Sequence, residues 1–223
     1  MDPHKMMVER LVSMGIIKSE RVRKAAESVP RELFVLPEYR DQAYDDRPLP
    51  IGEGQTISAP HMVFLMDELL DLRPGMLVLE VGTGSGYQAA TIAEIVAPKE
   101  DPDSWGHVIS AEINPFLADF AFANLRAAGY SDRVSVLNMD GSQGFPIRKK
   151  ADRILVTAAA PSIPEPLINQ LAEGGRMVIP VGPVRGFFFG QDLMLVVKSA
   201  GEVKVEKVID VAFVPLRGKY GWS

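Results

Sequence analysis

A short apolar run in the first half of this 223-residue chain ends in three closely spaced glycines. Residues 78–81 (Val-Leu-Glu-Val) predict a buried strand, and Gly82, Gly84 and Gly86 follow it. An alanine-rich segment comes next and predicts a helix. A glycine turn between a strand and a helix N-terminus is a common ligand-binding element of α/β proteins. The missing Cβ atoms let a ligand approach the backbone and permit positive φ angles.

The spacing of this turn indicates the kind of ligand. The glycines read G-x-G-x-G, whereas dinucleotide-binding proteins use G-x-G-x-x-G to place a pyrophosphate on the helix. Glu80 lies two residues before the first glycine, and an acid there suits a cationic ligand better than a pyrophosphate. S-adenosyl-L-methionine carries an ammonium and a sulfonium and no phosphate, so we favour a methyl-donor site. A dinucleotide site and a purely structural turn are the alternatives.

Two further acids are expected at the ends of neighbouring strands. Glu112 ends the next strand, where a carboxylate can accept hydrogen bonds from ribose hydroxyls of either kind of cofactor. Asp140 ends the third strand and could accept from an adenine amino group, while Gly141 would admit the ring. The simpler interpretations are a solvated strand-end acid at Glu112 and an ordinary turn at Asp140.

Small and polar residues mark two more segments. Residues 157–161 (Thr-Ala-Ala-Ala-Pro) leave room for a peptide backbone or a small ligand, but could equally serve tight helix–sheet packing. Enzymes that methylate nucleic-acid amino groups would be expected to show a polar-Pro-Pro-aromatic run here. Ser58 precedes a predicted helix start, where free N–H groups can bind an anion, although a loop serine is more often a helix cap. His4, His61 and His107 lack partners at metal-ligand spacing, so we expect no metal site.

Composition limits the possible functions. The net charge of −5 disfavours generic nucleic-acid binding, which needs a basic surface. The absence of cysteine excludes disulfides, cysteine metal sites and thiolate nucleophiles. No apolar run reaches the roughly 18 residues of a membrane span, and the polar residues 1–5 do not resemble a signal peptide. We therefore expect a cytoplasmic protein that binds neither membrane nor nucleic acid.

The elements that must position these residues alternate in type from residue 76 onward. We expect two N-terminal helices at 3–15 and 19–28, a structured loop at 41–56, and a helix from 60 to about 72 with a core stripe of Met62, Leu65, Met66 and Leu69. Strands are expected at 76–81, 107–112, 133–138, 152–157 and 175–181, and helices at 85–96, 115–128 and 164–172. A polar surface loop is expected at 98–106. Strand-like segments at 192–199 and 203–214, joined at Gly201, predict an antiparallel hairpin. The fold class is therefore α/β, a Rossmann-like, mostly parallel sheet with an N-terminal helical extension.

From about Val8 to Trp222 the chain closely resembles the protein-L-isoaspartate O-methyltransferase family. The resemblance rests on Gly54–Met62, Leu79–Gly86, Thr157–Pro161, Gly174–Gly182 and Phe213–Leu216. The block Gly-Gln-Thr-Ile-Ser-Ala-Pro-His-Met is specific to that family, whereas the glycine turn is shared by many methyltransferases. The resemblance implies repair of age-damaged protein. S-adenosyl-L-methionine would methylate the free α-carboxylate of an isoaspartyl residue, leaving S-adenosyl-L-homocysteine, and the ester would close to a succinimide that partly hydrolyses to aspartate.

The resemblance also assigns roles to individual residues. Ser58 matches the active-site serine. Cofactor contacts are implied for Thr56, Ile57, Ser58, Glu80, Val81, Gly82, Thr83, Gly84, Ser85, Tyr87, Glu112, Ile113, Asp140, Gly141 and Thr157. Substrate contacts are implied for Ile57, Ser58, Ala59, His61, Thr157, Ala158, Ala159 and Val214. We expect one methyltransferase domain, with helices and a loop over 1–56 and the α/β core over 57–223, acting as a monomer on isoaspartyl proteins and peptides.

Three features depart from the family pattern: a long 98–106 loop, Met139 before the third-strand acid, and the aromatic run Gly186–Gly190, which contains Phe187, Phe188 and Phe189. The aromatic run could reshape substrate access or form a dimer contact. Competing functions are another methyltransferase of the same fold, an NAD(P)-dependent oxidoreductase, and a binding module without activity. The chain lacks the glycine spacing expected of an oxidoreductase, and no Tyr/Lys or His/acid pair is evident in it.

Overall fold

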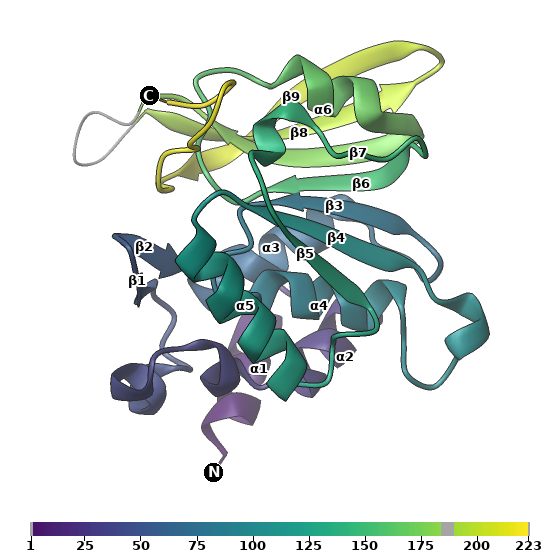
Figure 1. Cartoon of the computed structure of the whole chain (residues 1–223). Coiled ribbons are helices and arrows are strands. Elements are labelled where there is room, and N and C mark those ends of the chain that lie inside the picture. Colours follow the sequence, from purple (N-terminus) through teal and green to yellow (C-terminus); the bar gives the residue numbers. More distant parts are fainter. Residues whose placement is uncertain (1, 184–189, 223) are drawn as a thin grey trace.

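One mixed sheet organises the molecule. The computed structural model describes residues 2–183 and 190–222. Its sheet strands are β3 (Leu77–Val81), β4 (His107–Glu112), β5 (Val134–Asn138), β6 (Ala151–Val156), β7 (Leu171–Val181), β8 (Gln191–Ser199) and β9 (Glu202–Val211). They lie in the order β5-β4-β3-β6-β7-β8-β9, parallel from β5 to β7 and antiparallel from β7 to β9 (Figure 1). The predicted fold class and the C-terminal hairpin are therefore confirmed.

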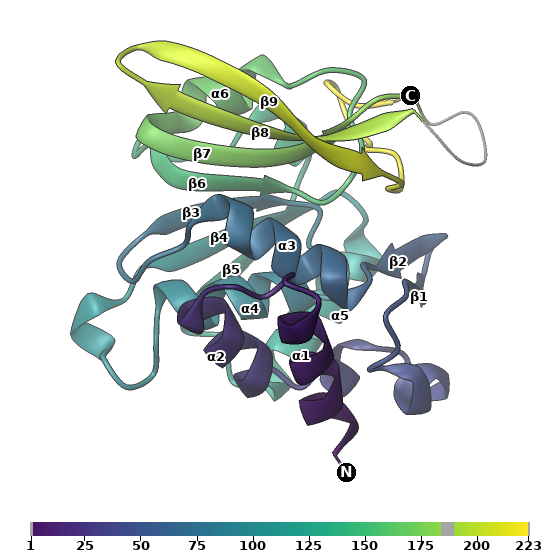
Figure 2. The same cartoon turned by 180° about the vertical axis from the view of Figure 1, so that it is seen from behind.

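Both faces of the central strands are covered, which explains why these strands are almost continuously apolar. The helices are α1 (Pro3–Ser13), α2 (Glu20–Ser28), α3 (Pro60–Leu70), α4 (Tyr87–Val96), α5 (Pro115–Ala127) and α6 (Glu165–Gln170). Figure 2 is seen from the side of the sheet that α3 covers, and Figure 1 from the side that α6 covers. Alternate strand residues supply separate cores, with Val78 and Leu155 on the α3 side and Leu79 and Ile154 on the α6 side.

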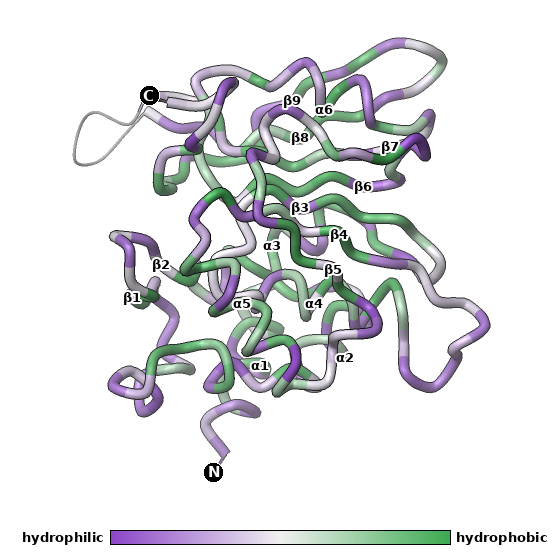
Figure 3. Tube along the Cα trace, in the orientation of Figure 1, coloured by the Kyte–Doolittle hydropathy of each residue, from purple (hydrophilic) through white to green (hydrophobic). Residues whose placement is uncertain are grey.

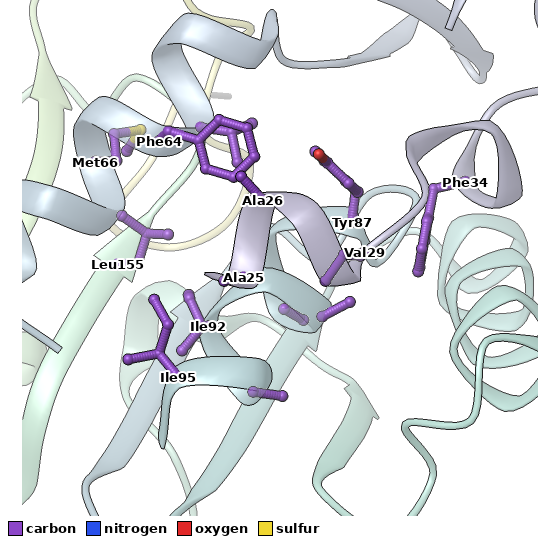
Figure 4. Close-up of a cluster of buried hydrophobic side chains, with 14 of the residues drawn as sticks. Ala25, Ala26, Val29, Phe34, Phe64, Met66, Tyr87, Ile92, Ile95 and Leu155 are labelled. Carbon is purple, nitrogen blue, oxygen red and sulfur yellow. The ribbon is translucent and has the colours of Figure 1, made fainter. Parts of the chain in front are cut away.

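The N-terminal helices form an outer layer against α4. Ser19 caps α2, accepting a hydrogen bond from the Val22 N–H, as a serine at this position should. Figure 4 shows Ala25 of α2 beside Ile92 of α4, in a cluster that also contains Val29 and Ile95. Small alanine side chains let the two helices approach closely. The predictions at 3–15 and 19–28 are confirmed within the usual uncertainty of helix ends.

The segment that leads to Ser58 differs from its prediction. Within the expected loop at 41–56, β1 (Leu49–Gly52) and β2 (Gln55–Ile57) form a separate antiparallel hairpin. Its turn contains Glu53 at φ +52°, between two glycines that also have positive φ. The loop at 98–106 is polar and lies outside the sheet, where the tube of Figure 3 is mostly purple. Within the described part of the chain, each helix is too short or too polar to cross a lipid bilayer.

The prediction of an apolar core stripe on α3 is only partly confirmed. Met66 is fully buried, but Met62, Leu65 and Leu69 are half-buried against the core. Because α3 packs between the sheet and the N-terminal helices, its buried surface is broader than one stripe, and it also includes Val63, Phe64, Asp67 and Leu70. The aromatic run Phe187–Phe189 lies outside the described residues.

Candidate active site

A cavity of about 520 Å³ lies at the carboxyl ends of the central strands. The strand order reverses between β3 and β6, which is where open α/β sheets bind their ligands. The β1–β2 hairpin and the C-terminal segment lie at this same end of the sheet (Figures 1 and 2). The lining residues fall within 51–58, 81–88, 111–117, 139–141, 157–158 and 214–217, together with Val63. Most of the residues predicted for the site are therefore brought together.

The glycine turn forms the floor of this cavity. Gly82, Gly84 and Gly86 all have positive φ, at +99°, +56° and +89°. A Cβ atom on Gly82 would lie 2.3 Å from Thr157 Oγ1, which donates a hydrogen bond to the Gly82 carbonyl at 2.6 Å. The first glycine is therefore required both by its backbone angle and by the close approach of Thr157. Tyr87 begins α4 directly after the turn and also lines the cavity.

Glu112 lies at the end of β4 with its carboxylate turned back on the turn. One oxygen accepts the Gly84 N–H at 2.9 Å, and the other accepts the Asn114 N–H at 3.0 Å. A carboxylate offers about four lone-pair sites, so each oxygen can still accept one more hydrogen bond. This arrangement fits the two adjacent hydroxyls of a ribose, and Glu112 and Ile113 both line the cavity.

Glu80 is buried beneath the turn and does not line the cavity. Ser110 Oγ donates a hydrogen bond to its carboxyl group, and Thr83 Oγ1 lies 2.6 Å from the same serine oxygen. Burial raises the pKa of Glu80 to about 8, so the group is mostly protonated at neutral pH. Glu80 is thus linked to the cavity lining through Ser110 and Thr83. Direct contact with a cofactor stays a prediction.

Asp140 has a different set of partners from the expected adenine amino group. Its Oδ1 accepts the Ser142 N–H at 3.0 Å, and its Oδ2 accepts the Lys219 N–H at 2.8 Å and Gln143 Nε2 at 3.0 Å. Burial would raise the pKa of Asp140, but the hydrogen bond from Ser142 Oγ at 2.6 Å, together with these others, outweighs it and holds the pKa below its ordinary value. Asp140 therefore joins the end of β5 to the C-terminal segment and lies outside the cavity lining.

Gly141 lines the cavity, and packing against its neighbours is one reason why this residue is a glycine. A Cβ atom there would lie 2.9 Å from the Ala111 Cβ and 3.0 Å from Val81 Cγ1. The residue must therefore be glycine to fit against β3 and β4. Contacts of Asp140 and Gly141 with adenine stay predictions.

Ser58 lies between β2 and α3, half-buried in the cavity wall beside Thr56 and Ile57. Ala59 and His61 lie outside the lining. Ala59 is buried at the start of α3, whereas His61 is fixed by Asp46, whose Oδ1 accepts the His61 N–H and lies 2.9 Å from the ring Nδ1. The contact of His61 holds the preceding loop against the helix that follows Ser58.

The opposite wall is made by two segments that are distant in sequence. Thr157, Ala158 and Val214 line the cavity, but Ala159 is fully buried. The Ala159 N–H donates to the Val214 carbonyl at 2.8 Å, and its carbonyl accepts the Leu216 N–H at 2.9 Å. The peptide groups of Ala159 are therefore used to dock the C-terminal segment, so Ala159 positions the wall without forming its surface.

Sequence reasoning missed part of the lining. Beyond the predicted residues, the cavity is bordered by Ile51, Glu53, Gln55, Val63, Gln88, Ala111, Asn114, Pro115, Phe116, Leu117, Met139, Pro215, Leu216 and Arg217. The pair Asn114-Pro115 had a readable signal, because an Asn before Pro is a typical helix start, and Asn114 does cap α5 two residues after Glu112. Arg217 had no such signal, since its place depends on the C-terminal segment folding back.

Comparisons with known proteins agree with this site. A family model described as Protein-L-isoaspartate(D-aspartate) O-methyltransferase (PCMT) matches residues 2–221. A protein-L-isoaspartate O-methyltransferase of Korarchaeum cryptofilum is 63% identical over 221 residues, covering 99% of each chain, and one of Hyperthermus butylicus is 57% identical over 97% of this chain and 89% of the relative. A Plasmodium falciparum structure of the same family name, in complex with S-adenosyl-L-homocysteine, superposes with a TM-score of 0.83 at 29% identity, covering 97% of this chain and 99% of the other.

The predicted resemblance is thus confirmed across nearly the whole chain. The chain belongs to the protein-L-isoaspartate(D-aspartate) O-methyltransferase family and is a methyltransferase that uses S-adenosyl-L-methionine.

Proposed function

We propose that Ser58 is the catalytic residue of this enzyme, and that it aligns the free α-carboxylate of an L-isoaspartyl residue for methylation in damaged proteins. The observation that carries this proposal is that Ser58, the glycine turn and Glu112 line one cavity. S-adenosyl-L-methionine, when bound, supplies an electrophilic methyl group. Glu112 and the turn would hold its adenosine end, and Ser58 would face the acceptor.

The chemistry asks the protein for alignment rather than for a base. An α-carboxylate has an ordinary pKa near ~3.5, so it is already ionised at neutral pH. Ser58 would donate a hydrogen bond to one carboxylate oxygen and leave the other free to attack. His61, the nearest histidine in sequence, lies outside the lining and is paired with Asp46, which fits a reaction without a general base. Alignment of this kind can contribute on the order of 7–11 kcal/mol.

The substrate wall would complete this alignment. Ile57, Ala158 and Val214 present small or apolar surfaces toward the cavity, so they would exclude water from the reacting groups. Thr157 would contribute to both sides of the site, because it supports the glycine turn and borders Ala158. Ala59 and Ala159 would act one layer behind the surface by fixing the backbone of their neighbours.

The test combines two peptides and one variant. The peptides are identical except that one carries isoaspartate and the other aspartate, and the measurement is transfer of labelled methyl from S-adenosyl-L-methionine. We expect base-labile label on the isoaspartyl peptide alone. Ser58→Ala should lower kcat about 10-fold to 150-fold, the range for a lost hydrogen bond to a charged group, while the Kd for S-adenosyl-L-homocysteine stays nearly unchanged. Wild-type turnover in this variant would reject the role of Ser58.

We further propose that the chain is a single-domain monomer that acts in the cytoplasm, without nucleic acid or membrane. One sheet supports both hydrophobic cores, which favours a single domain. The net charge of −5 disfavours a polyanionic partner. Size-exclusion chromatography with light scattering tests the monomer, and a mass of twice 24.4 kDa would reject it.

A further inference from the structure

Charge is distributed unevenly around the cavity. Among the described residues that line it, Arg217 is the one cation, whereas Glu53 and Glu112 are acids. Arg217 is exposed, and its side chain makes no ion pair or hydrogen bond with any described residue. A guanidinium that borders a binding cavity without an internal partner is available to a ligand.

The backbone that carries Arg217 is firmly held on both sides. The preceding Leu216 N–H donates to Ala159, and the Trp222 N–H donates to the Leu216 carbonyl at 2.7 Å. The following Gly218 has φ +124°, and a Cβ atom there would lie 2.2 Å from Asp140 Oδ1. The segment is thus pinned to the ends of two strands, so Arg217 loses little backbone freedom when it binds a partner.

The acids and the cation belong to different segments of the lining. Glu53 accepts a hydrogen bond from Asn114 Nδ2 at 3.1 Å, which places it beside Glu112 and the cofactor side. Arg217 belongs to the segment that pairs with Ala159 and forms the substrate wall. A substrate that enters along this wall therefore meets a positive charge at the rim.

We propose that Arg217 determines substrate specificity by favouring isoaspartyl sites with an acidic side chain within two residues of the isoaspartate. This inference rests on the proposed function. The reacting carboxylate must reach Ser58 inside the cavity, so a rim guanidinium is left to pair with a flanking carboxylate, whose two oxygens match its planar donors. Because the pair is exposed, the preference is modest, about 2-fold to 5-fold in kcat/KM.

The experiment compares pairs of isoaspartyl peptides that differ only in having Glu or Gln at one position. One pair is made for each of the two positions before and the two positions after the isoaspartate. For the wild type, we expect the Glu peptide to have a kcat/KM about 2-fold to 5-fold higher at one or more positions, falling toward equality in about 0.5 M NaCl, because salt screens exposed pairs. Arg217→Gln should remove the preference, and Arg217→Lys should keep part of it. The readout is a ratio within one enzyme, so a general loss of activity in a variant cancels.

Lys219→Gln is the matched control. It removes the same charge from the same exposed segment, but Lys219 does not line the cavity, so the preference should remain. A preference unchanged in Arg217→Gln, lost equally in Lys219→Gln, or absent from the wild type would overturn the inference while leaving the methyltransferase activity intact. Methylation of neither peptide by the wild type would instead overturn the proposed function, and the inference with it.

Discussion

Replacing Glu112 by glutamine tests how the cofactor side of the cavity is built. In the wild type, each carboxylate oxygen accepts one backbone N–H, from Gly84 and from Asn114. Glutamine has one oxygen and one NH₂ group, so one of these N–H donors would face another donor. An unpaired buried donor costs about 1–3 kcal/mol, and a lost hydrogen bond to a charged group costs about 1.5–3 kcal/mol. The unpaired donor should lower the free energy of unfolding, and the lost hydrogen bond should weaken the binding of the cofactor.

Two measurements separate these effects. Urea denaturation without ligand should show unfolding easier by about 1–3 kcal/mol, and calorimetry with S-adenosyl-L-homocysteine should show a Kd about 10-fold to 150-fold higher. Glu53→Gln is the control, because Glu53 is an exposed lining acid whose carboxylate accepts a hydrogen bond from the Asn114 side chain, so the Kd of this variant should change by less than about 3-fold. A Glu112→Gln protein that is destabilised but binds S-adenosyl-L-homocysteine like the wild type would refute the ribose assignment.

Two further changes test the turn and the group beneath it. Gly82→Ala should lose detectable S-adenosyl-L-homocysteine binding in calorimetry, because Gly82 has φ +99° and the added methyl group would meet Thr157. Gly129→Ala is the control, because Gly129 also has a positive φ, +79°, but lies in open space. This variant should lose about 1 kcal/mol of stability and keep its affinity. For Glu80, burial raises the pKa to about 8 from an ordinary 4.5, so its contribution to stability is complete below about pH 4.5 and is lost as the pH rises to 8. Glu80→Gln cannot ionise, so its free energy of unfolding should fall less than that of the wild type between pH 5 and pH 8; parallel pH profiles would contradict the buried protonated state.

The sheet was predictable because its strands are locally unmistakable. In β3, Val78 faces one side of the sheet and Leu79 the other, so the strand is apolar on both faces. It runs directly into a glycine turn, and this pattern is typical of a parallel strand that is covered on both faces. The β1–β2 hairpin was missed for the opposite reason. Each of its strands is only a few residues long, and Pro50 within β1 reads as a loop signal. Its pairing depends on the fold around it.

The same division holds in the cavity. Gly82 and Glu112 could be located from sequence because Gly82 follows one strand, Glu112 ends the next, and the carboxyl ends of parallel strands meet. The surroundings of Asp140 could not, since its Oδ2 accepts the backbone N–H of Lys219, about 80 residues later in the chain. Ala159 is similar, because its burial follows from the C-terminal segment. Contacts between such distant residues leave no local pattern.

The position of residues 214–217 has a consequence for the growing polypeptide. The glycine turn and Glu112 are synthesised early, whereas the wall opposite Ser58 leaves the ribosome only after β8 and β9 have been made. A nascent chain that has already made its parallel strands therefore has the cofactor side of the cavity, and Thr157 and Ala158 of the substrate wall, before it has residues 214–217. The order of synthesis thus leaves this part of the substrate wall to form last.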